Sequence, residues 1–389
     1  MNVPAVALPI TLLAAAAFLS SAGTRVVDPL LHAIATDFST TVPAVAIIVA
    51  AFTLPYGLCQ ILLGPLGDKF GKLRVMLVAL TAYSIAIGAC AFASSLPVLT
   101  VLRALAGAAS AAIIPVGMAY IGDAVAYKDR QVTLSRYLNG IVLTQLIAGP
   151  LGGVFGDYVG WRGVFLVLAA GGLVVAFIMW RQIDRLPDRR SGTATFSLAN
   201  YAILLRPGLP RVVLLAGFID GIVLMGSFPF LAPYMHEAFG LDYLPVGLIL
   251  GCFGLGALLY TRTAKYLVPR LGEPGLVLLG GVAMASAVVL AVLTPVWWPL
   301  ILVQGLLGFG FFLLHGVLQA RATEMLPAAR ATAVASFAFT LFAGQSIGAL
   351  VIAGMIAHVG YRGAFALDAV AVLILGLWLS LTLRRMSAG

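Results

Sequence analysis

Long runs of apolar residues follow one another along the whole chain, separated by short breaks that carry charges, proline or glycine. A helix needs about 20 apolar residues to cross a bilayer, and the pattern predicts twelve such helices. The first run has no Lys or Arg before it, which argues against a cleaved signal peptide. We expect the helices at 8–34, 44–65, 75–94, 97–121, 133–156, 162–181, 210–235, 243–263, 275–294, 297–321, 333–357 and 361–383.

The composition supports a membrane protein. Hydrophobic residues make up 62% of the 389 residues and charged residues 10%, against roughly 45–50% and about 25% in soluble domains. The three cysteines stand singly inside apolar runs, so no disulfide or metal site is indicated. We predict an all-α membrane protein.

The basic residues gather in alternate loops. Only Arg162 and Arg362 fall on the opposite side, and Arg25 and Arg103 lie within predicted helices. Lys and Arg are retained in the cytoplasm, so we expect a multi-pass protein of the cytoplasmic (inner) membrane with both termini cytoplasmic, and no nucleic-acid partner. The loop residues of the basic side are Lys69, Lys72, Arg74, Lys128, Arg130, Arg136, Arg181, Arg185, Arg189, Arg190, Arg206, Arg211, Arg262, Lys265, Arg270, Arg321, Arg330, Arg384 and Arg385.

An internal repeat divides the chain. Residues 182–208 form the one long polar connector, and 160–165 (GWRGVF) return at 360–365 as GYRGAF. Arg103 corresponds to Gln304 at nearly the same offset of about 200 residues. We predict an N-terminal six-helix bundle (1–181), a cytoplasmic linker (182–208) and a pseudo-symmetric C-terminal bundle (209–389). Repeats of this kind are typical of transporters with a site between the halves near the bilayer midplane.

A glycine-rich cationic string follows the second predicted helix, GPLGDKFGKLR at 64–74. It resembles the signature loop of the major facilitator superfamily, G-x-L-a-D-[RK]-x-G-[RK]-[RK], with Leu73 at a position that is often basic. The resemblance implies the major facilitator fold and a conformational latch that exchanges ion pairs as the halves rock. The implied latch residues are Gly64, Gly67, Asp68, Lys69, Gly71, Lys72 and Arg74, with Asp123 and Arg130 as further charges.

The fifth predicted helix carries a second motif. Its string resembles G-(x)8-G-P-x-x-G-G, a motif of drug–proton antiporters in that superfamily. Small residues from Gly140 to Gly156 also recur every fourth position, which predicts a smooth face for close helix packing. Generic packing remains the alternative interpretation. The motif residues are Gly140, Gly149, Pro150, Gly152 and Gly153.

Charges inside the membrane indicate function, because each costs about 2.5–3.5 kcal/mol on insertion scales. Arg25 and Asp28 share one face of the first helix, which His32 extends outward, and Arg103 lies in the fourth. Our hypothesis makes Asp28 the proton acceptor that competes with cargo, while both arginines tune it. A static Arg25–Asp28 pair is the alternative.

Three further titratable residues leave alternatives open. Asp220 is a second proton or cation site, or it only faces the cytoplasmic vestibule. His315 is a proton-coupling residue on a polar stripe of the tenth helix, or a buried hydrogen-bonded histidine. Asp368 is expected to pair with Arg362.

Polar side chains on the predicted cavity-lining helices are candidates for binding cargo. An apolar cavity with few charges suits amphipathic substrates, although tyrosines near helix ends often only anchor the interface. The candidates are Tyr56, Gln60, Asn139, Gln145, Tyr234, Gln304, Gln319 and Gln345.

These patterns favour a proton-coupled exporter of drugs or small amphipathic molecules that works by alternating access. The alternative is a carrier of one metabolite, such as a sugar, amino acid or organic anion. We see no catalytic or nucleotide-binding constellation, so an enzyme is not expected. The expected partners are a small-molecule substrate, protons as coupling ion and the lipid bilayer, with no other cofactor, and we expect a monomer.

Overall fold

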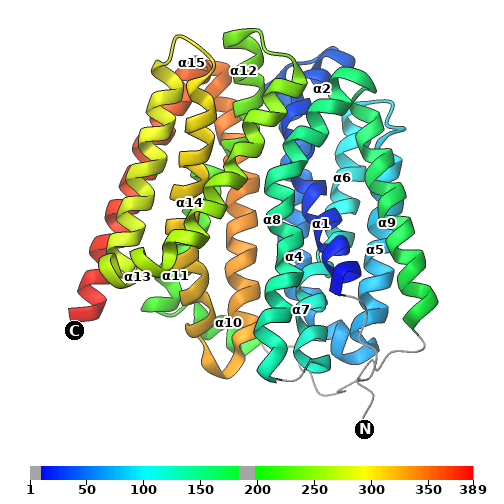
Figure 1. Ribbon diagram of the computed structural model, residues 1–389, viewed down its shortest axis with the longest axis vertical. Coiled ribbons are helices and arrows are strands. Elements are labelled where there is room, and N and C mark those ends of the chain that lie inside the picture. The colour runs from blue at the N-terminus through cyan, green and yellow to red at the C-terminus, as the bar shows by residue number, and fades with distance from the viewer. Residues whose placement is uncertain (1–9, 126, 184–197, 389) are drawn as a thin grey trace.

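A computed structural model describes residues 10–125, 127–183 and 198–388, and these contain helices and no strand (Figure 1). The first set of helices is α1 (Ile10–Arg25), η1 (Asp28–Leu30), α2 (Leu31–Asp37), α3 (Val42–Val45), α4 (Ile47–Phe70), α5 (Lys72–Cys90), α6 (Leu96–Ser110), α7 (Ile113–Ala124), α8 (Tyr127–Tyr158) and α9 (Trp161–Ile183). The second set is α10 (Leu198–Leu204), α11 (Leu209–Asp220), η2 (Gly221–Met225), η3 (Phe228–Phe230), α12 (Leu231–Phe239), α13 (Tyr243–Leu293), α14 (Pro299–Glu324), η4 (Pro327–Ala329) and α15 (Arg330–Ala388).

Ten continuous helical stretches in the described residues are long and apolar enough to cross a membrane. Two of them contain a residue with non-helical backbone angles, Gly272 in α13 and Gly360 in α15, and the chain turns back there (Figure 1). Each of these two stretches therefore supplies two crossings, which confirms the predicted all-helical architecture.

The helices form two bundles that stand side by side (Figure 1). We call α1–α9 the N-terminal half and α10–α15 the C-terminal half. Buried hydrophobic residues form two clusters. One comes from 13–183 apart from Ala349, and the other comes from 204–383 apart from Ala46. The large size of both clusters explains how each half holds its helices together.

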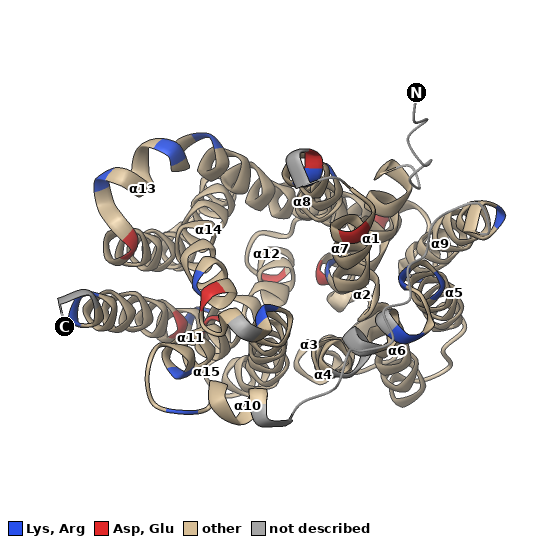
Figure 2. Cartoon of the chain, turned by 90° about the horizontal axis from the view of Figure 1, so that it is seen from below, with Lys and Arg blue, Asp and Glu red and all other residues tan. Residues whose placement is uncertain are grey.

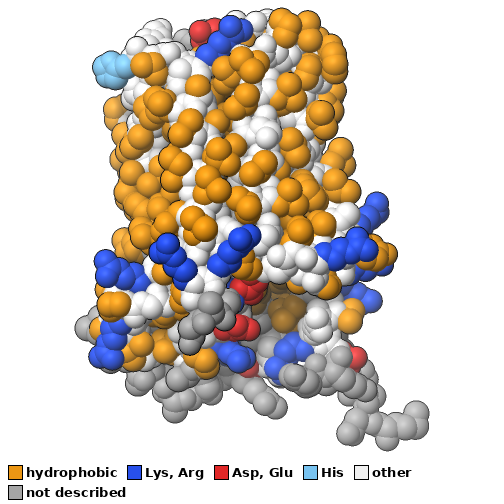
Figure 3. All heavy atoms as spheres, turned by 90° about the vertical axis from the view of Figure 1, so that its left-hand side faces the viewer, with side chains coloured by type: hydrophobic (Ala, Val, Ile, Leu, Met, Phe, Trp, Pro, Cys, Tyr) orange, Lys and Arg blue, Asp and Glu red, His pale blue; other side chains and the backbone are white. Residues whose placement is uncertain are grey.

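The two ends of the molecule differ in charge. A broad band of hydrophobic side chains covers the face shown in Figure 3, and Lys and Arg gather at its lower edge. Figure 2, seen from that end, shows Lys, Arg, Asp and Glu around the rim. We call it the basic end and the opposite one the far end. Exposed apolar residues such as Leu302 (64% exposed) and Val78 (68%) lie within helices long and apolar enough to cross a membrane, as expected for side chains in contact with lipid.

Two details differ from the sequence prediction. The string after the second crossing is not a loop, because α4 continues through it to Phe70 and the chain turns only at Gly71, whose φ of 97° favours glycine. Within the predicted linker 182–208, residues 198–204 form the helix α10. Residues 184–197 lie outside the described part of the chain.

The first crossing of each half is interrupted at corresponding positions. In the N-terminal half, α1 gives way to the 3-10 turn Asp28–Leu30. At an offset of 200 residues, the 3-10 turn Phe228–Pro229–Phe230 follows the π-helical stretch η2. Proline at the second position of both turns lacks the N–H that a continuous helix needs. These interruptions place Asp28 at a break in its helix.

Candidate transport site between the two halves

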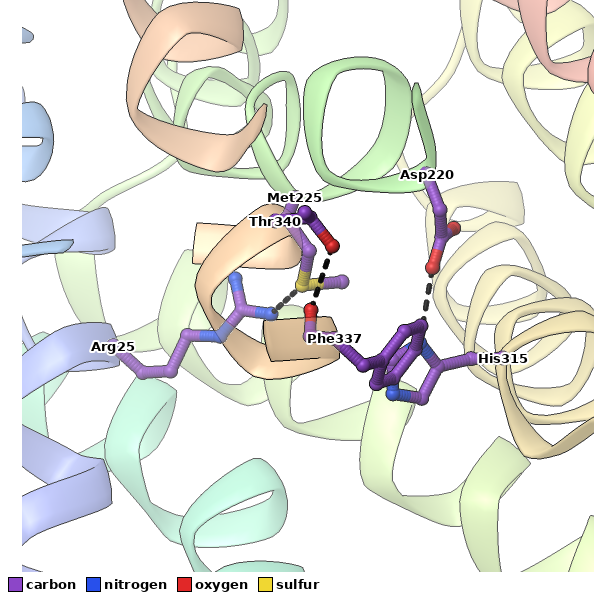
Figure 4. Close-up of polar contacts among 6 residues, drawn as sticks. All are labelled: Arg25, Asp220, Met225, His315, Phe337 and Thr340. Atoms are coloured by element: carbon purple, nitrogen blue, oxygen red, sulfur yellow. Dashed lines mark hydrogen bonds and ion pairs between the residues drawn. The ribbon is translucent and has the colours of Figure 1, made fainter. Parts of the chain in front are cut away.

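Arg25 joins the two halves at the centre of the molecule. Its Nη2 donates to the Sδ of Met225 over 2.8 Å, and its guanidinium lies 4.4 Å above the Phe228 ring. Figure 4 shows the side chain reaching toward Met225. Met225 is the residue of the second half that corresponds to Arg25 in the repeat, at an offset of 200 residues. Two corresponding residues that touch each other must lie beside the pseudo-twofold axis that relates the two halves. A thioether is a weak acceptor, so this contact is readily exchanged.

Asp28 lies beside this contact and is 2% exposed. Its Oδ2 is 3.6 Å from Nη1 of Arg25, which is an ion pair but too long for a good hydrogen bond. Oδ1 of Asp28 and Nη1 of Arg25 have no hydrogen-bond partner among the described residues. The carboxylate is therefore incompletely satisfied, and one of its oxygens can take up a proton without breaking a hydrogen bond.

Arg103 is fully buried inside the N-terminal half. Its Nη1 donates to the Gly23 carbonyl over 2.7 Å and its Nε to the Ile48 carbonyl over 3.3 Å, with the guanidinium 4.3 Å above the Phe52 ring. These bonds tie α6 to the first and second crossings. These contacts give Arg103 a positioning role, and its charge is held on the Asp28 side of the molecule.

Asp220 and His315 form a pair within the C-terminal half. The sequence analysis treated the two residues separately and did not predict that they meet. Nδ1 of His315 lies 3.0 Å from Oδ2 of the fully buried Asp220. The imidazole stacks on Phe311 at 4.6 Å between ring centroids and packs against Phe337. Oδ1 of Asp220 has no partner in the described chain. Figure 4 shows the pair across from Arg25, on the other side of the α15 segment around Phe337.

Two more polar side chains are buried in the C-terminal half. Gln304, the mate of Arg103, is fully buried, and both its amide atoms lack partners within the residues described. Asp368 is 4% exposed, and its Oδ2 has no hydrogen-bond partner among the described residues. The expected pair with Arg362 is wrong: Arg362 is exposed, and no ion pair joins the two in the described ranges. Arg362 does not pair with Asp368 because it lies next to Gly360, where the chain reverses direction.

Apart from Gln304 and Tyr234, the predicted cargo-binding residues differ in their contacts and burial. Tyr56 and Gln60 lie four residues apart on α4, on one face of the helix. Tyr56 also contacts Phe342 of the opposite half at 4.7 Å between centroids. Gln345 is buried on α15 beside the backbone of Gly221. Gln145 is half-buried, whereas Asn139 and Gln319 are exposed.

Tyr234 does not join the other candidates. It is buried in an aromatic cluster of the C-terminal half with Phe239, Tyr361 and Phe365, and its hydroxyl donates to the Ala291 carbonyl over 2.9 Å. A buried Tyr hydroxyl needs a partner, and the backbone supplies it here. The structure therefore gives this residue a packing role.

Some of the predicted latch residues make contacts at the basic end. Nζ of the buried Lys72 lies 2.6 Å from Oδ2 of Asp123, which ties α5 to α7. Lys69 and Arg74 are exposed, and Arg130 reaches the Val125 carbonyl at 3.5 Å. Gly67 packs on Lys72 and Val116. Gly64 and the Asp68 side chain lie outside the described residues.

The glycines of the antiporter-like motif pack in two directions. A Cβ on Gly152 would lie 2.6 Å from the Val26 carbonyl oxygen, and one on Gly140 would overlap the Ala14 carbonyl, so these glycines let α8 approach the first crossing. A Cβ on Gly149 would lie 2.7 Å from the Gly247 carbonyl oxygen, and one on Gly153 2.5 Å from that of Tyr243. The second pair thus lets α8 approach α13 of the opposite half, where Pro150 also packs on Gly251.

The far end holds polar contacts between the halves. The Asp157 carboxylate, at the end of α8, accepts from the N–H groups of Tyr243 and Leu244 over 3.0 and 2.8 Å. It thereby caps the first turn of α13 in the other half. The halves are therefore closed against each other at the far end.

Several of these residues escaped sequence analysis, among them Met225, Phe228 and Asp157. The internal repeat could have indicated Met225 and Phe228, because they correspond to Arg25 and Asp28 at an offset of 200 residues. The indication for Asp157 is weaker and consists only of its position just before the helix break at Gly160.

The site has the form of a membrane carrier: two similar bundles, a charged contact on the axis between them, and a closed end that opposes the basic end. The family comparison agrees. A model described as Major Facilitator Superfamily matches residues 13–219 and 213–388, and the chain belongs to that superfamily of transporters.

Individual relatives are distant. The chain is 26% identical over 252 residues to YwfA of Bacillus subtilis (strain 168), an uncharacterized MFS-type transporter, with 64% of this chain and 61% of that protein covered. It is 27% identical over 359 residues to a chloramphenicol resistance protein of Streptomyces lividans, with 90% of each covered. It resembles the crystal structure of a bacterial homolog of the human lysosomal transporter Spinster with a TM-score of 0.80 and 17% identity, covering 96% of each chain.

Proposed function

We propose that the protein is a proton-coupled exporter of small amphipathic molecules and that Asp28 carries the proton. The observation that supports this most is the Arg25 contact, which joins the two halves beside the incompletely paired Asp28 carboxyl. When the halves rock, Arg25 leaves Met225 and Phe228, and its pairing with Asp28 changes. The position of the halves then controls how firmly Asp28 holds a proton, because an opposite charge favours the ionised carboxylate.

The cargo is inferred from the surroundings and from one relative. Tyr56, Phe342, Phe337 and Phe311 present aromatic faces near the contact between halves, and aromatic walls suit amphipathic molecules. The name of the Streptomyces relative points to chloramphenicol, and we take this compound as the first probe. One proton entering supplies about 2.3 kcal/mol per 100 mV.

The orientation follows from charge. Lys and Arg are retained in the cytoplasm, and they gather at the basic end (Figure 3). We therefore take the basic end as cytoplasmic and the far end as outer. The closed far end then corresponds to a carrier that is ready to accept cargo from the cytoplasm.

A specific carrier of an acidic metabolite is the second candidate. It is favoured by Nη1 of Arg25, which is buried without a hydrogen-bond partner in the described residues and would suit an acid oxygen of the cargo. Such a carrier would transport one compound with saturation and would not raise tolerance to unrelated toxic compounds.

Growth of a drug-sensitive bacterium tests the proposal. Expression of the chain should raise tolerance to chloramphenicol and to other unrelated compounds, and a protonophore should remove the gain. Asp28→Asn should lose it as well. Asp37→Asn is the matched control, because Asp37 is an exposed acid at the far end paired with Arg162. Full tolerance in the Asp28→Asn variant would refute the role of this carboxyl.

A further inference from the structure

Two histidines meet across the closed far end. His32 on α2 and His236 on α12 stack at 5.6 Å between ring centroids with an interplanar angle of 26°. His32 is exposed, and Nε2 of His236 is buried without a hydrogen bond in the described chain. Because the rings belong to opposite halves, they face each other only while this end is closed.

Water and protons can reach the His32 side of the pair. A cavity of about 360 Å³ at the far end is lined by His32 together with Thr36, Thr40, Glu237 and Tyr361. The cavity lies where the two halves adjoin, since its walls come from α2, α12 and α15. The Tyr243 ring at the start of α13 lies 4.4 Å from the His236 ring, between centroids. The other titratable groups around the two histidines are Glu237 on α12, Asp157 at the end of α8, Asp242 next to Tyr243, and Tyr361 on α15.

None of the three acids nearby, Glu237, Asp157 and Asp242, forms an ion pair with either ring among the described residues. Asp157 is engaged by two backbone N–H groups of α13, and a single Glu237 remains on the cavity side. Histidine changes charge between about pH 5 and 8 in ordinary surroundings. Two protonated rings at this separation would repel each other, and separation of the halves relieves the repulsion.

We infer that His32 and His236 form a proton-binding site that opens the far end when both rings are protonated. At neutral pH the rings stack and, with the Asp157 contact, hold the halves together. Two unit charges 5.6 Å apart in a partly screened setting change the ratio of open to closed molecules by about tenfold. The inference uses the proposed function only to identify the far end as the outer one. An acidic exterior would then favour the conformation in which protons reach the central site.

The opening can be measured without transport. Spin labels are placed on Ser94→Cys and Pro295→Cys, exposed positions in the far-end loops of the two halves, after Cys59, Cys90 and Cys252 are replaced by alanine. Distance distributions of the purified full-length protein are recorded at pH 8 and pH 5. We expect the fraction with a long distance to rise so that the open-to-closed ratio increases about tenfold at pH 5.

Histidine variants give the decisive comparison. The double variant His32→Gln/His236→Gln should change by less than about twofold between the two pH values. His358→Gln, an exposed histidine at the same end on α15, should behave as the parent protein. His32→Gln alone is a second test that spares the buried ring. It should lose most of the response, because one charge has no partner to repel.

Two results would overturn the inference: a parent protein whose distances do not respond to pH, or a double variant that keeps the full response. Failure of the proposed function is a separate outcome. If Asp28→Asn still exchanges protons for cargo while the histidine response holds, the central proton site is wrong and the far-end site stands.

Discussion

The contact between α8 and α13 predicts how a single methyl group changes the conformational balance. An added Cβ on Gly149 would lie 2.7 Å from the Gly247 carbonyl oxygen and 3.1 Å from Cβ of Leu250. Gly149→Ala must therefore push the two helices apart. Because the contact joins opposite halves, the cost falls on the state that is closed at the far end and not on the fold of either half.

The size of the effect follows from overpacking, which costs about 1–3 kcal/mol in well-packed sites. A cost of about 1.4 kcal/mol on the closed state changes the open-to-closed ratio about tenfold. Gly107→Ala is the matched control. Its Cβ would overlap the Phe52 carbonyl oxygen inside the N-terminal half, so the substitution should lower the free energy of unfolding and leave the ratio unchanged.

The spin-label pair at positions 94 and 295 measures the ratio at one pH, and thermal unfolding measures stability. Gly149→Ala should move the distance distribution toward longer values with a small loss of stability. An unchanged distribution would refute the reasoning, as would an equal shift in Gly107→Ala. Transport by Gly149→Ala should also slow, because closure of the far end is one step of the cycle.

Three further predictions concern stability and the latch. Tyr234→Phe should lower the free energy of unfolding by about 1 kcal/mol, because the hydroxyl bond to Ala291 is lost; denaturation in detergent checks this, and binding of cargo should be unaffected. Arg103→Lys should cost about 1.5–3 kcal/mol, because a lysine cannot keep both backbone bonds of the guanidinium; a melting temperature equal to that of the parent would contradict this. Asp123→Asn should cost less than about 1 kcal/mol, because the acid partner of Lys72 is 44% exposed, yet slow transport; a transport rate equal to the parent's would argue against a latch.

The crossings could be predicted because lipid imposes a length and an apolar composition on each helix. The predicted 162–181 appears as Trp161–Ile183 and 97–121 as the stretch Leu96–Ala124. The ends of helices were predicted less accurately where a single glycine determines the position at which the chain turns. At Gly71, the helix runs on through charged residues that composition assigns to a loop.

The partners of the charged residues could not be predicted in the same way. Asp220 and His315 are 95 residues apart, and their meeting depends on how α11 and α14 are rotated against each other. The same holds for Asp157, whose partners are backbone groups that every residue except proline carries. Arg25 and Met225 are the exception, because a symmetric repeat brings mates together near its axis.

Proton movement by the reconstituted protein tests the central claim most directly. In vesicles that contain a pH-sensitive dye, an imposed chloramphenicol gradient should drive protons in the opposite direction. Asp28→Asn should move no protons, while Asp37→Asn should match the parent. Chloramphenicol transport without proton movement, or proton exchange that survives in Asp28→Asn, would contradict the account.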